Sequence, residues 1–206
     1  MKRKVDFRLI LITDRKLCTN LTSRISQACS AGIKAVLLRE KDLEDGYLLA
    51  LSKKIKVITG KTNSKLFISD RYDIAILSGA EGIHSPEKGI TPQQLIKPVN
   101  LLIGRSVHSI ASAQTAEKLG FDYLLFGSVY RTPAKIKYGA PKGLKKLKEV
   151  CDAVNIPVFA VGGINPKRAG KCLQSGAHGA AVIRELMLSD NIKKTVNEFK
   201  DEMGEL

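Results

Sequence analysis

The chain has 206 residues, enough for one well-filled core but slightly short for a typical eight-fold barrel, so its loops must be brief. Its 44% hydrophobic and 26% charged residues fit a soluble globular protein, and no apolar run is long enough to span a bilayer. A formal net charge of +14 leaves nucleic acid, a membrane surface and small polyanions open as partners.

The distribution of the positive charge along the chain narrows the range of possible partners. The lysines are spread over many predicted helices and are not interleaved with aromatic residues. This favours a solvated surface with a field directed at phosphate over a nucleic-acid footprint, so we expect neither a nucleic-acid nor a membrane partner. A homo-oligomer remains open.

Two features bear on cellular location. The N-terminal MKRKVDFRLILITDR is basic and then apolar, but its apolar run is short, is interrupted by Arg8 and lacks a cleavage site, so we interpret it as a first strand and not as a signal peptide. The cysteines have no C-x-x-C spacing and no nearby histidine pair, so neither a zinc site nor a disulfide framework is predicted. They are Cys18, Cys29, Cys151 and Cys172. A reducing cytoplasm fits best.

Short β-branched or leucine-rich runs alternate along the chain with stretches of helical period. The predicted strands are residues 7–13, 35–39, 66–69, 82–84, 101–106, 123–127, 157–161 and 179–183. Predicted helices include residues 21–31, 43–59, 110–119, 144–154 and 166–174, and Gly32, Gly60, Gly120 and Gly176 follow helical segments as C-caps do. The alternation predicts an α/β protein, a (β/α)₈ TIM barrel in a single domain over residues 1–206.

The run PVFAVGGIN is the clearest functional signal, because a buried strand opens into Gly162 and Gly163 and then a helix. Glycines allow backbone amides to approach a phosphate, and the helix start supplies partial positive charge. A further strand ends at another helix start, at Arg184, and such a pair of junctions is where (β/α)₈ barrels commonly hold phosphate. An open doubly wound sheet is the alternative, but its phosphate glycines usually follow the first strand, where this chain has Asp14 and Arg15.

Polar side chains follow every predicted strand before the glycines. They are Thr13, Asp14 and Arg15; Arg39, Glu40 and Lys41; Ser69, Asp70 and Arg71; His84; Ser106 and His108; and Thr132 and Lys135. Functional groups of a barrel project from these strand ends, and this set suits an anionic small molecule that carries phosphate. Two interpretations without a ligand remain open. Arg39 and Lys41 could form an ion-paired rim with Glu40 at the surface, and Asp70 could cap the next helix.

The two histidines of this set differ. His84 lacks polar neighbours in the sequence and is more typical of a packed histidine than of a site residue. His108 lies two positions past Ser106 in GRSVHS, so the two side chains can point to the same side. Because histidine titrates near neutrality, His108 is the best candidate for acid–base chemistry.

Several motifs resemble those of the thiamine phosphate synthase and TenI-type thiazole tautomerase superfamily across nearly the whole chain. They are LITDR, LLREK, ISDRYDIAILSGAEGIH, IGRSVH, DYLLFGSVYRTPAK with PKG downstream, and PVFAVGGIN with GAHGAAVI. The resemblance implies a (β/α)₈ barrel that handles a thiazole phosphate. It assigns the phosphate to Gly162, Gly163 and the amides near Ile183 and Arg184.

Departures from the synthase pattern bear on which branch the chain joins. The family's Gln-Leu-Arg-x-Lys has Leu37 in place of Gln, its Asn-Asp has Ser69 in place of Asn, and Gly89 and Ala134 replace a metal-binding aspartate and a threonine. The positions that match are Arg39, Lys41, Asp70, Ser106, Thr132 and Lys135. The pyrimidine half is altered while the thiazole-phosphate half is intact, which favours a thiazole tautomerase.

For a tautomerase we expect His108 to move the proton, with Ser106 as its hydrogen-bond partner and no cofactor. Arg39, Lys41 or Lys135 would hold the substrate carboxylate. The alternative is thiamine phosphate synthase, which joins a pyrimidine methyl pyrophosphate to thiazole phosphate with Mg²⁺ at Asp70, where Glu87 lies close enough in the sequence to substitute for the missing aspartate. A third possibility is a barrel that binds thiazole or thiamine phosphate without turnover.

Overall fold

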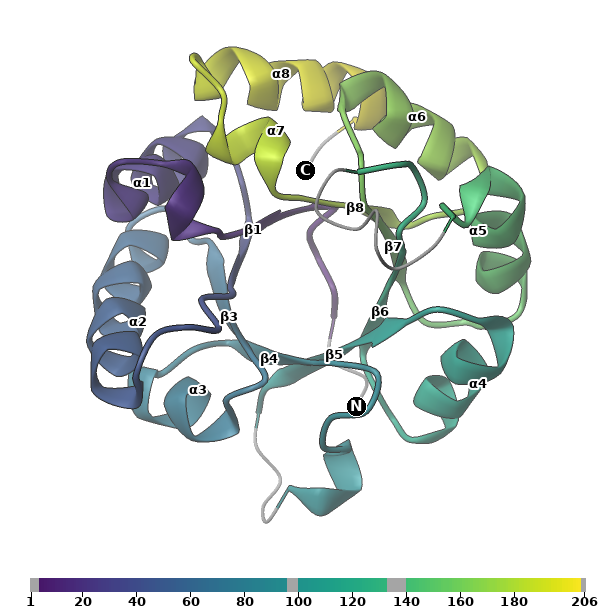
Figure 1. Cartoon of the computed structure of the whole chain (residues 1–206), viewed down its shortest axis with the longest axis horizontal. Helices are drawn as coiled ribbons and strands as arrows, with labels where there is room; N and C mark the ends of the chain where they lie inside the picture. The colour runs from purple at the N-terminus through teal and green to yellow at the C-terminus, as the bar shows by residue number, and fades with distance from the viewer. Residues whose placement is uncertain (1–3, 96–99, 133–139, 205–206) are drawn as a thin grey trace.

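A computed structural model of the chain describes residues 4–95, 100–132 and 140–204. Eight parallel strands close into a barrel in chain order, and β1 pairs with both β2 and β8. Helices lie around the outside of this ring (Figure 1). The predicted TIM barrel is therefore confirmed, and the open sheet is wrong because an open sheet would leave β1 or β8 at an edge.

The strands lie close to the predicted ranges. They are β1 (Leu9–Ile12), β2 (Ala35–Leu38), β3 (Lys65–Ser69), β4 (Gly82–Ser85), β5 (Leu102–Val107), β6 (Tyr123–Gly127), β7 (Val158–Val161) and β8 (Gly179–Val182). The helices are α1 (Leu21–Ala31), α2 (Asp45–Gly60), α3 (Tyr72–Ser78), α4 (Ile110–Lys118), α5 (Gly143–Asp152), α6 (Pro166–Gln174), α7 (Arg184–Met187) and α8 (Ile192–Met203). Two 3₁₀ turns accompany them, η1 (Arg15–Leu17) and η2 (Pro92–Gln94). No helix in the described ranges has the length and hydropathy needed to cross a bilayer.

Helix ends follow ordinary capping chemistry with one departure from prediction. Asn20 and Asn165 cap α1 and α6 through their side chains, and Gly32 ends α1 in the left-handed conformation. Gly60, which we expected just beyond α2, is the last residue of that helix, and Lys61 follows it as the cap. This glycine has no left-handed role because the helix continues through it.

The barrel interior is filled with side chains. Four aromatic rings, one from the segment before β1 and the others from β3, β6 and β7, pack against one another with centroid separations of 5.4–6.2 Å. They belong to Phe7, Phe67, Tyr123 and Phe159. Gly104 makes room for them, because a Cβ there would lie 2.1 Å from Cζ of Tyr123. The packed rings leave no room for a ligand at this level of the barrel, so a ligand is expected at the C-terminal ends of the strands.

Candidate functional site

One group of predicted residues lies around a pocket at the C-terminal ends of β2 and β3. The pocket has a volume of about 200 Å³, and we call it the β2–β3 pocket. It is lined by Leu38, Glu40, Lys41, Leu43, Leu48, Ser69, Asp70 and Arg71. Because Leu38 pairs with Ile68, Arg39 follows β2 directly beside Ser69 at the end of β3. The structure thus brings together Lys41, Ser69 and Asp70 and places Arg39 at the same rim.

Glu40 does not neutralise these cations, contrary to the ion-paired rim considered from the sequence. It is buried, it accepts a 2.6 Å hydrogen bond from the Thr13 hydroxyl, and it accepts bonds of 3.1 Å from the Arg15 amide. Within the described ranges, neither Arg39 nor Lys41 forms a salt bridge. Their charges therefore remain available to an anionic ligand.

Asp70 is presented to the rim by an unusual backbone conformation. Its φ is 60°, in the left-handed region that aspartate and asparagine tolerate better than most residues. It does not cap α3, which has Arg71 at its N-cap position and no side-chain cap bond. Arg71 instead pairs with Asp45 and, at 2.6 Å, with Asp73. Asp70 is exposed beside the pocket, so its carboxylate is free for another role.

The loop formed by Gly162 and Gly163, here called the glycine loop, follows β7 next to the end of β8. Both residues have positive φ, 98° and 65°, which favours glycine. The Gly162 carbonyl accepts from the Tyr130 amide at 3.0 Å, and the Gly163 carbonyl accepts from Nη1 of Arg168 at 2.7 Å. The guanidinium of Arg168 also lies over the Tyr130 ring, 4.7 Å from its centroid. Both carbonyls are thus held by protein donors.

The other residues predicted to bind the substrate phosphate or its surroundings are Ile183, Arg184, Thr132 and Lys135. Val161 pairs with Ala181, so the glycine loop lies beside Ile183 and the start of α7 at Arg184. Arg184 is exposed. Thr132 is half-buried in the loop that follows β6, whereas Lys135 falls outside the described residues. The binding roles of all these residues remain predictions.

His108 is placed as a base would need to be. It follows β5 beside the end of β6, and its Nδ1 lies 2.6 Å from the Gly127 carbonyl oxygen. A carbonyl can only accept, so Nδ1 carries a proton, and in the neutral form of the ring Nε2 is the nitrogen with the lone pair. The residue is exposed. His108 is therefore oriented with a proton-accepting nitrogen available, although no contact tests the catalytic role that we predicted.

Ser106 has a different partner from the one expected. We predicted a hydrogen bond to His108, but the Ser106 hydroxyl lies 2.9 Å from Nε2 of His84. The prediction was wrong because β5 ends at Val107, so His108 turns toward β6 while Ser106 faces the barrel interior beside β4. His84 is only 4% exposed and is a packed histidine, as expected, yet it contacts a predicted site residue.

Burial, with a smaller effect from the nearby positive charge of Arg39, lowers the pKa of His84 to about 3. The unfolded state therefore binds an additional proton as pH falls below the ordinary histidine value near 6.5. We expect the stability advantage of wild type over His84→Gln to shrink by about 2 kcal/mol between pH 7.5 and pH 5. Urea unfolding of both proteins at the two pH values measures this, and a constant difference would contradict the neutral buried state of His84.

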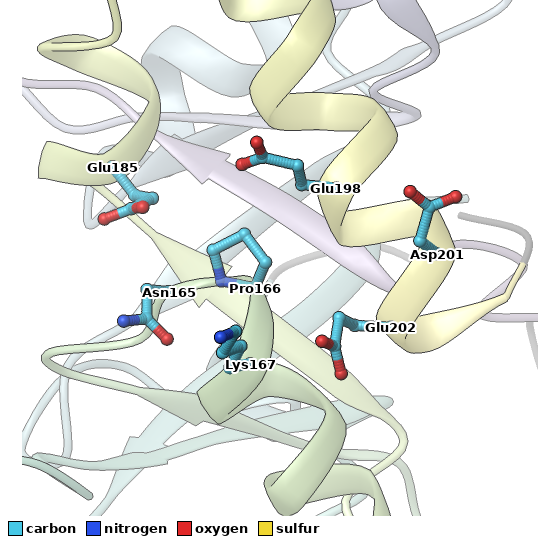
Figure 2. A pocket seen from close by; sticks show the side chains of 7 residues that line it. All are labelled: Asn165, Pro166, Lys167, Glu185, Glu198, Asp201 and Glu202. Carbon is cyan, nitrogen blue, oxygen red and sulfur yellow. The ribbon is translucent and has the colours of Figure 1, made fainter.

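A larger cleft of about 400 Å³ lies outside the barrel wall between α6, α7 and α8. Figure 2 shows its lining, which is Asn165, Pro166, Lys167, Glu185, Glu198, Asp201 and Glu202. Burial raises the pKa of the Glu185 carboxyl, and the neighbouring Glu198 raises it further. Four carboxylates against one lysine have the wrong sign for a phosphate, so the barrel mouth and not this cleft is the candidate site.

Comparisons with known proteins identify the family of the chain. The model of the family described as thiamine monophosphate synthase (TMP-TENI) matches residues 9–186. A putative thiamine-phosphate synthase 2 of Aquifex aeolicus is 40% identical over 85% of this chain and 95% of its own. The thiamine-phosphate synthase of Clostridium tetani is 35% identical over 96% of each chain. A solved structure, thiamine phosphate pyrophosphorylase from Pyrococcus furiosus, superposes with a TM-score of 0.86 at 32% identity, covering 96% of this chain and 95% of the other.

Proposed function

The chain belongs to the thiamine monophosphate synthase and TenI family, and on that basis we propose that it is a thiamine-phosphate synthase. It is an enzyme of thiamine biosynthesis. Relatives that are 34–40% identical over most of their length carry the name thiamine-phosphate synthase, in two cases as putative. The comparisons therefore support the transferase, which the sequence offered as the alternative, better than the tautomerase.

The observation that carries the proposal is the presence of two separate regions suited to anions at one barrel mouth. Lys41 and Arg39 lie at the ends of β2 and β3, while the glycine loop lies at the end of β7. In the closed ring, β3 and β7 are separated by β4, β5 and β6 on one side and by β8, β1 and β2 on the other. An enzyme that joins two phosphorylated substrates needs two such regions, whereas a tautomerase would use the Arg39 side only for the carboxylate of its single phosphorylated substrate.

In this proposal the reaction is a substitution at the pyrimidine methylene. The thiazole nitrogen forms a C–N bond to that carbon, the carbon–oxygen bond to pyrophosphate breaks, and pyrophosphate leaves with its electron pair. Arg39 and Lys41 stabilise the charge that grows on the leaving group. The glycine loop and the backbone near Ile183 hold the thiazole phosphate so that its nitrogen faces the methylene.

Magnesium is the cofactor expected with a pyrophosphate leaving group. The exposed carboxylate of Asp70 fits it, since Mg²⁺ is commonly held by one or two carboxylates together with substrate phosphates and water. When bound, the ion would neutralise charge on the departing pyrophosphate. Glu40 cannot contribute as freely, because its oxygens already accept from Thr13 and Arg15.

Two-ligand calorimetry tests the two-region proposal without depending on turnover. We expect Mg²⁺-pyrophosphate and thiazole phosphate to bind together, with neither displacing the other. Lys41→Met should weaken the binding of pyrophosphate by about tenfold and leave the affinity for thiazole phosphate unchanged, because the substitution removes a charged donor at one region only. Mutual displacement, or equal weakening of both ligands, would contradict two separate regions.

Thiazole tautomerase is the second candidate, and the state of His108 favours it. The bond to Gly127 leaves Nε2 as a proton acceptor at the mouth, which is what a residue moving a proton between two carbons requires. Leu37, buried in the barrel interior, also removes the amide that the synthase pattern has at this position. His108→Asn would abolish proton transfer in a tautomerase while retaining phosphate binding.

A further inference from the structure

The interior of the barrel holds a polar group that the proposed chemistry does not use. His84 lies on β4 with both ring nitrogens buried: Nε2 is 2.9 Å from the Ser106 hydroxyl, and Nδ1 has no hydrogen-bond partner in the described structure. A buried polar atom without a partner is unfavourable, so its retention needs an explanation. The explanation has to account for the orientation of the His84–Ser106 bond.

The unpartnered nitrogen indicates which atom of the pair donates. If Ser106 donated to Nε2, the ring proton would sit on Nδ1 as a buried donor with nothing to accept it. If Nε2–H donates to Ser106, Nδ1 is only an unused acceptor. Orphaned buried donors are rarer in proteins than under-used acceptors, so the second arrangement is favoured.

Tyr123 is a second polar group of the barrel interior that has no hydrogen-bond partner in the described structure. Its ring centroid lies 5.7 Å from that of His84, and its hydroxyl is likewise buried without a partner. Burial raises the pKa of the Tyr123 phenol, so the proton stays on its oxygen.

From this arrangement we propose that His84 is a positioning residue, whose Nε2–H fixes the Ser106 hydroxyl so that its own hydrogen is donated to the substrate. With one lone pair of Ser106 occupied by His84, the O–H is directed to a partner other than His84. Ser106 is half-buried near the C-terminal end of β5, and the positive charge of Arg39 is close enough to act on His84. The acceptor would therefore be an atom of the anionic substrate held on the Arg39 side.

This assignment rests on the proposed function, because it needs pyrimidine methyl pyrophosphate to bind at that side. The assignment predicts that the site selects a substrate with a hydrogen-bond acceptor at this position. A substrate group that can only donate would be repelled by the hydroxyl hydrogen of Ser106. His84 never touches the substrate and acts only through Ser106.

A double-mutant cycle separates this role from a merely structural one. Full-length wild type, His84→Leu, Ser106→Ala and the double variant would be titrated calorimetrically with pyrimidine methyl pyrophosphate and Mg²⁺. We expect His84→Leu to weaken binding by about fivefold in the wild-type background and by less than about twofold when Ser106 is already Ala. Equal losses in both backgrounds would overturn the proposal.

Conservative variants provide a second readout. Glutamine places an amide N–H about where Nε2 lies, whereas asparagine places it about where Nδ1 lies, so His84→Gln should retain affinity and His84→Asn should not. If all three replacements weaken binding alike, the residue serves packing alone and the proposal fails.

An arm that needs no substrate keeps this inference separate from the proposed function. Imidazole ¹⁵N chemical shifts of the full-length protein report which ring nitrogen of His84 carries the proton. We expect the Nε2–H tautomer, and an Nδ1–H tautomer would overturn the inference whatever reaction the protein catalyses. Absence of pyrimidine pyrophosphate binding by wild type, with the Nε2–H tautomer present, would instead refute the proposed function and the substrate-directed part of this role.

Discussion

Replacing Asp70 by asparagine is expected to lower the Mg²⁺-dependent formation of thiamine phosphate by at least about 100-fold. The reason is that Asp70 is the exposed carboxylate at the β2–β3 pocket, and an amide does not replace an ionised ligand for a hard cation. Asparagine is the right replacement because it tolerates the φ of 60° that Asp70 adopts. The change therefore removes charge with little backbone strain.

The way in which the activity of this variant depends on Mg²⁺ concentration is as informative as the size of the activity loss. Activity should recover only in part at high Mg²⁺, and affinity for thiazole phosphate at the glycine loop should be unchanged. Asp152→Asn on α5 is the matched control, because Asp152 is an exposed aspartate paired with Lys148 and lies outside the barrel. Full coupling activity in Asp70→Asn would show that Asp70 does not hold the metal.

Gly162→Ala is expected to weaken thiazole phosphate binding by about 100-fold and to destabilise the fold by about 2–4 kcal/mol. A Cβ at this position would lie 2.4 Å from Oγ and 2.8 Å from Cα of Ser128, and the residue has a φ of 98°. Relief of that contact must move the glycine loop away from the loop after β6. The amides that we expect to bind phosphate would then lose their common orientation.

Gly120→Ala isolates the part of this effect that comes from backbone conformation. Gly120 also has a positive φ, 80°, but no atom lies within 4 Å of a Cβ built there. We expect it to lose about 1 kcal/mol of stability and no ligand affinity. Equal stability losses measured by urea unfolding in the two variants would show that contact with Ser128 is not what requires glycine at position 162.

The barrel was predictable because its signals are local. Each buried strand is a short apolar run, and the polar residues that follow it come directly after it in the chain. The order of the runs is enough to place Arg39, Asp70, Ser106 and the glycines at one end, since parallel strands share a direction. The helices α3 and α8 were not among the predicted helices, α7 was predicted only as a helix start at Arg184, and on α3 the exposed Ile76 and Leu77 blur the amphipathic pattern.

The pairing of side chains could not be predicted, because it depends on neighbours in space. Ser106 and His84 are 22 residues apart and meet only through the β4–β5 register. The contact of Arg168 with Gly163 and Tyr130 was missed for a related reason: the sequence places Arg168 on α6 but not over the loop after β6. A sequence-based reading of strand ends finds candidate groups, while closure of the barrel decides which of them interact.

The most direct test of the account is a coupling assay on the purified protein with pyrimidine methyl pyrophosphate and thiazole phosphate, with and without Mg²⁺. A parallel reaction contains only the unaromatised carboxythiazole phosphate tautomer. The account predicts thiamine phosphate and equimolar pyrophosphate in the presence of Mg²⁺, and at most background without it. No coupling against an active control enzyme, together with conversion of the tautomer that His108→Asn abolishes, would contradict the synthase and establish the isomerase in its place.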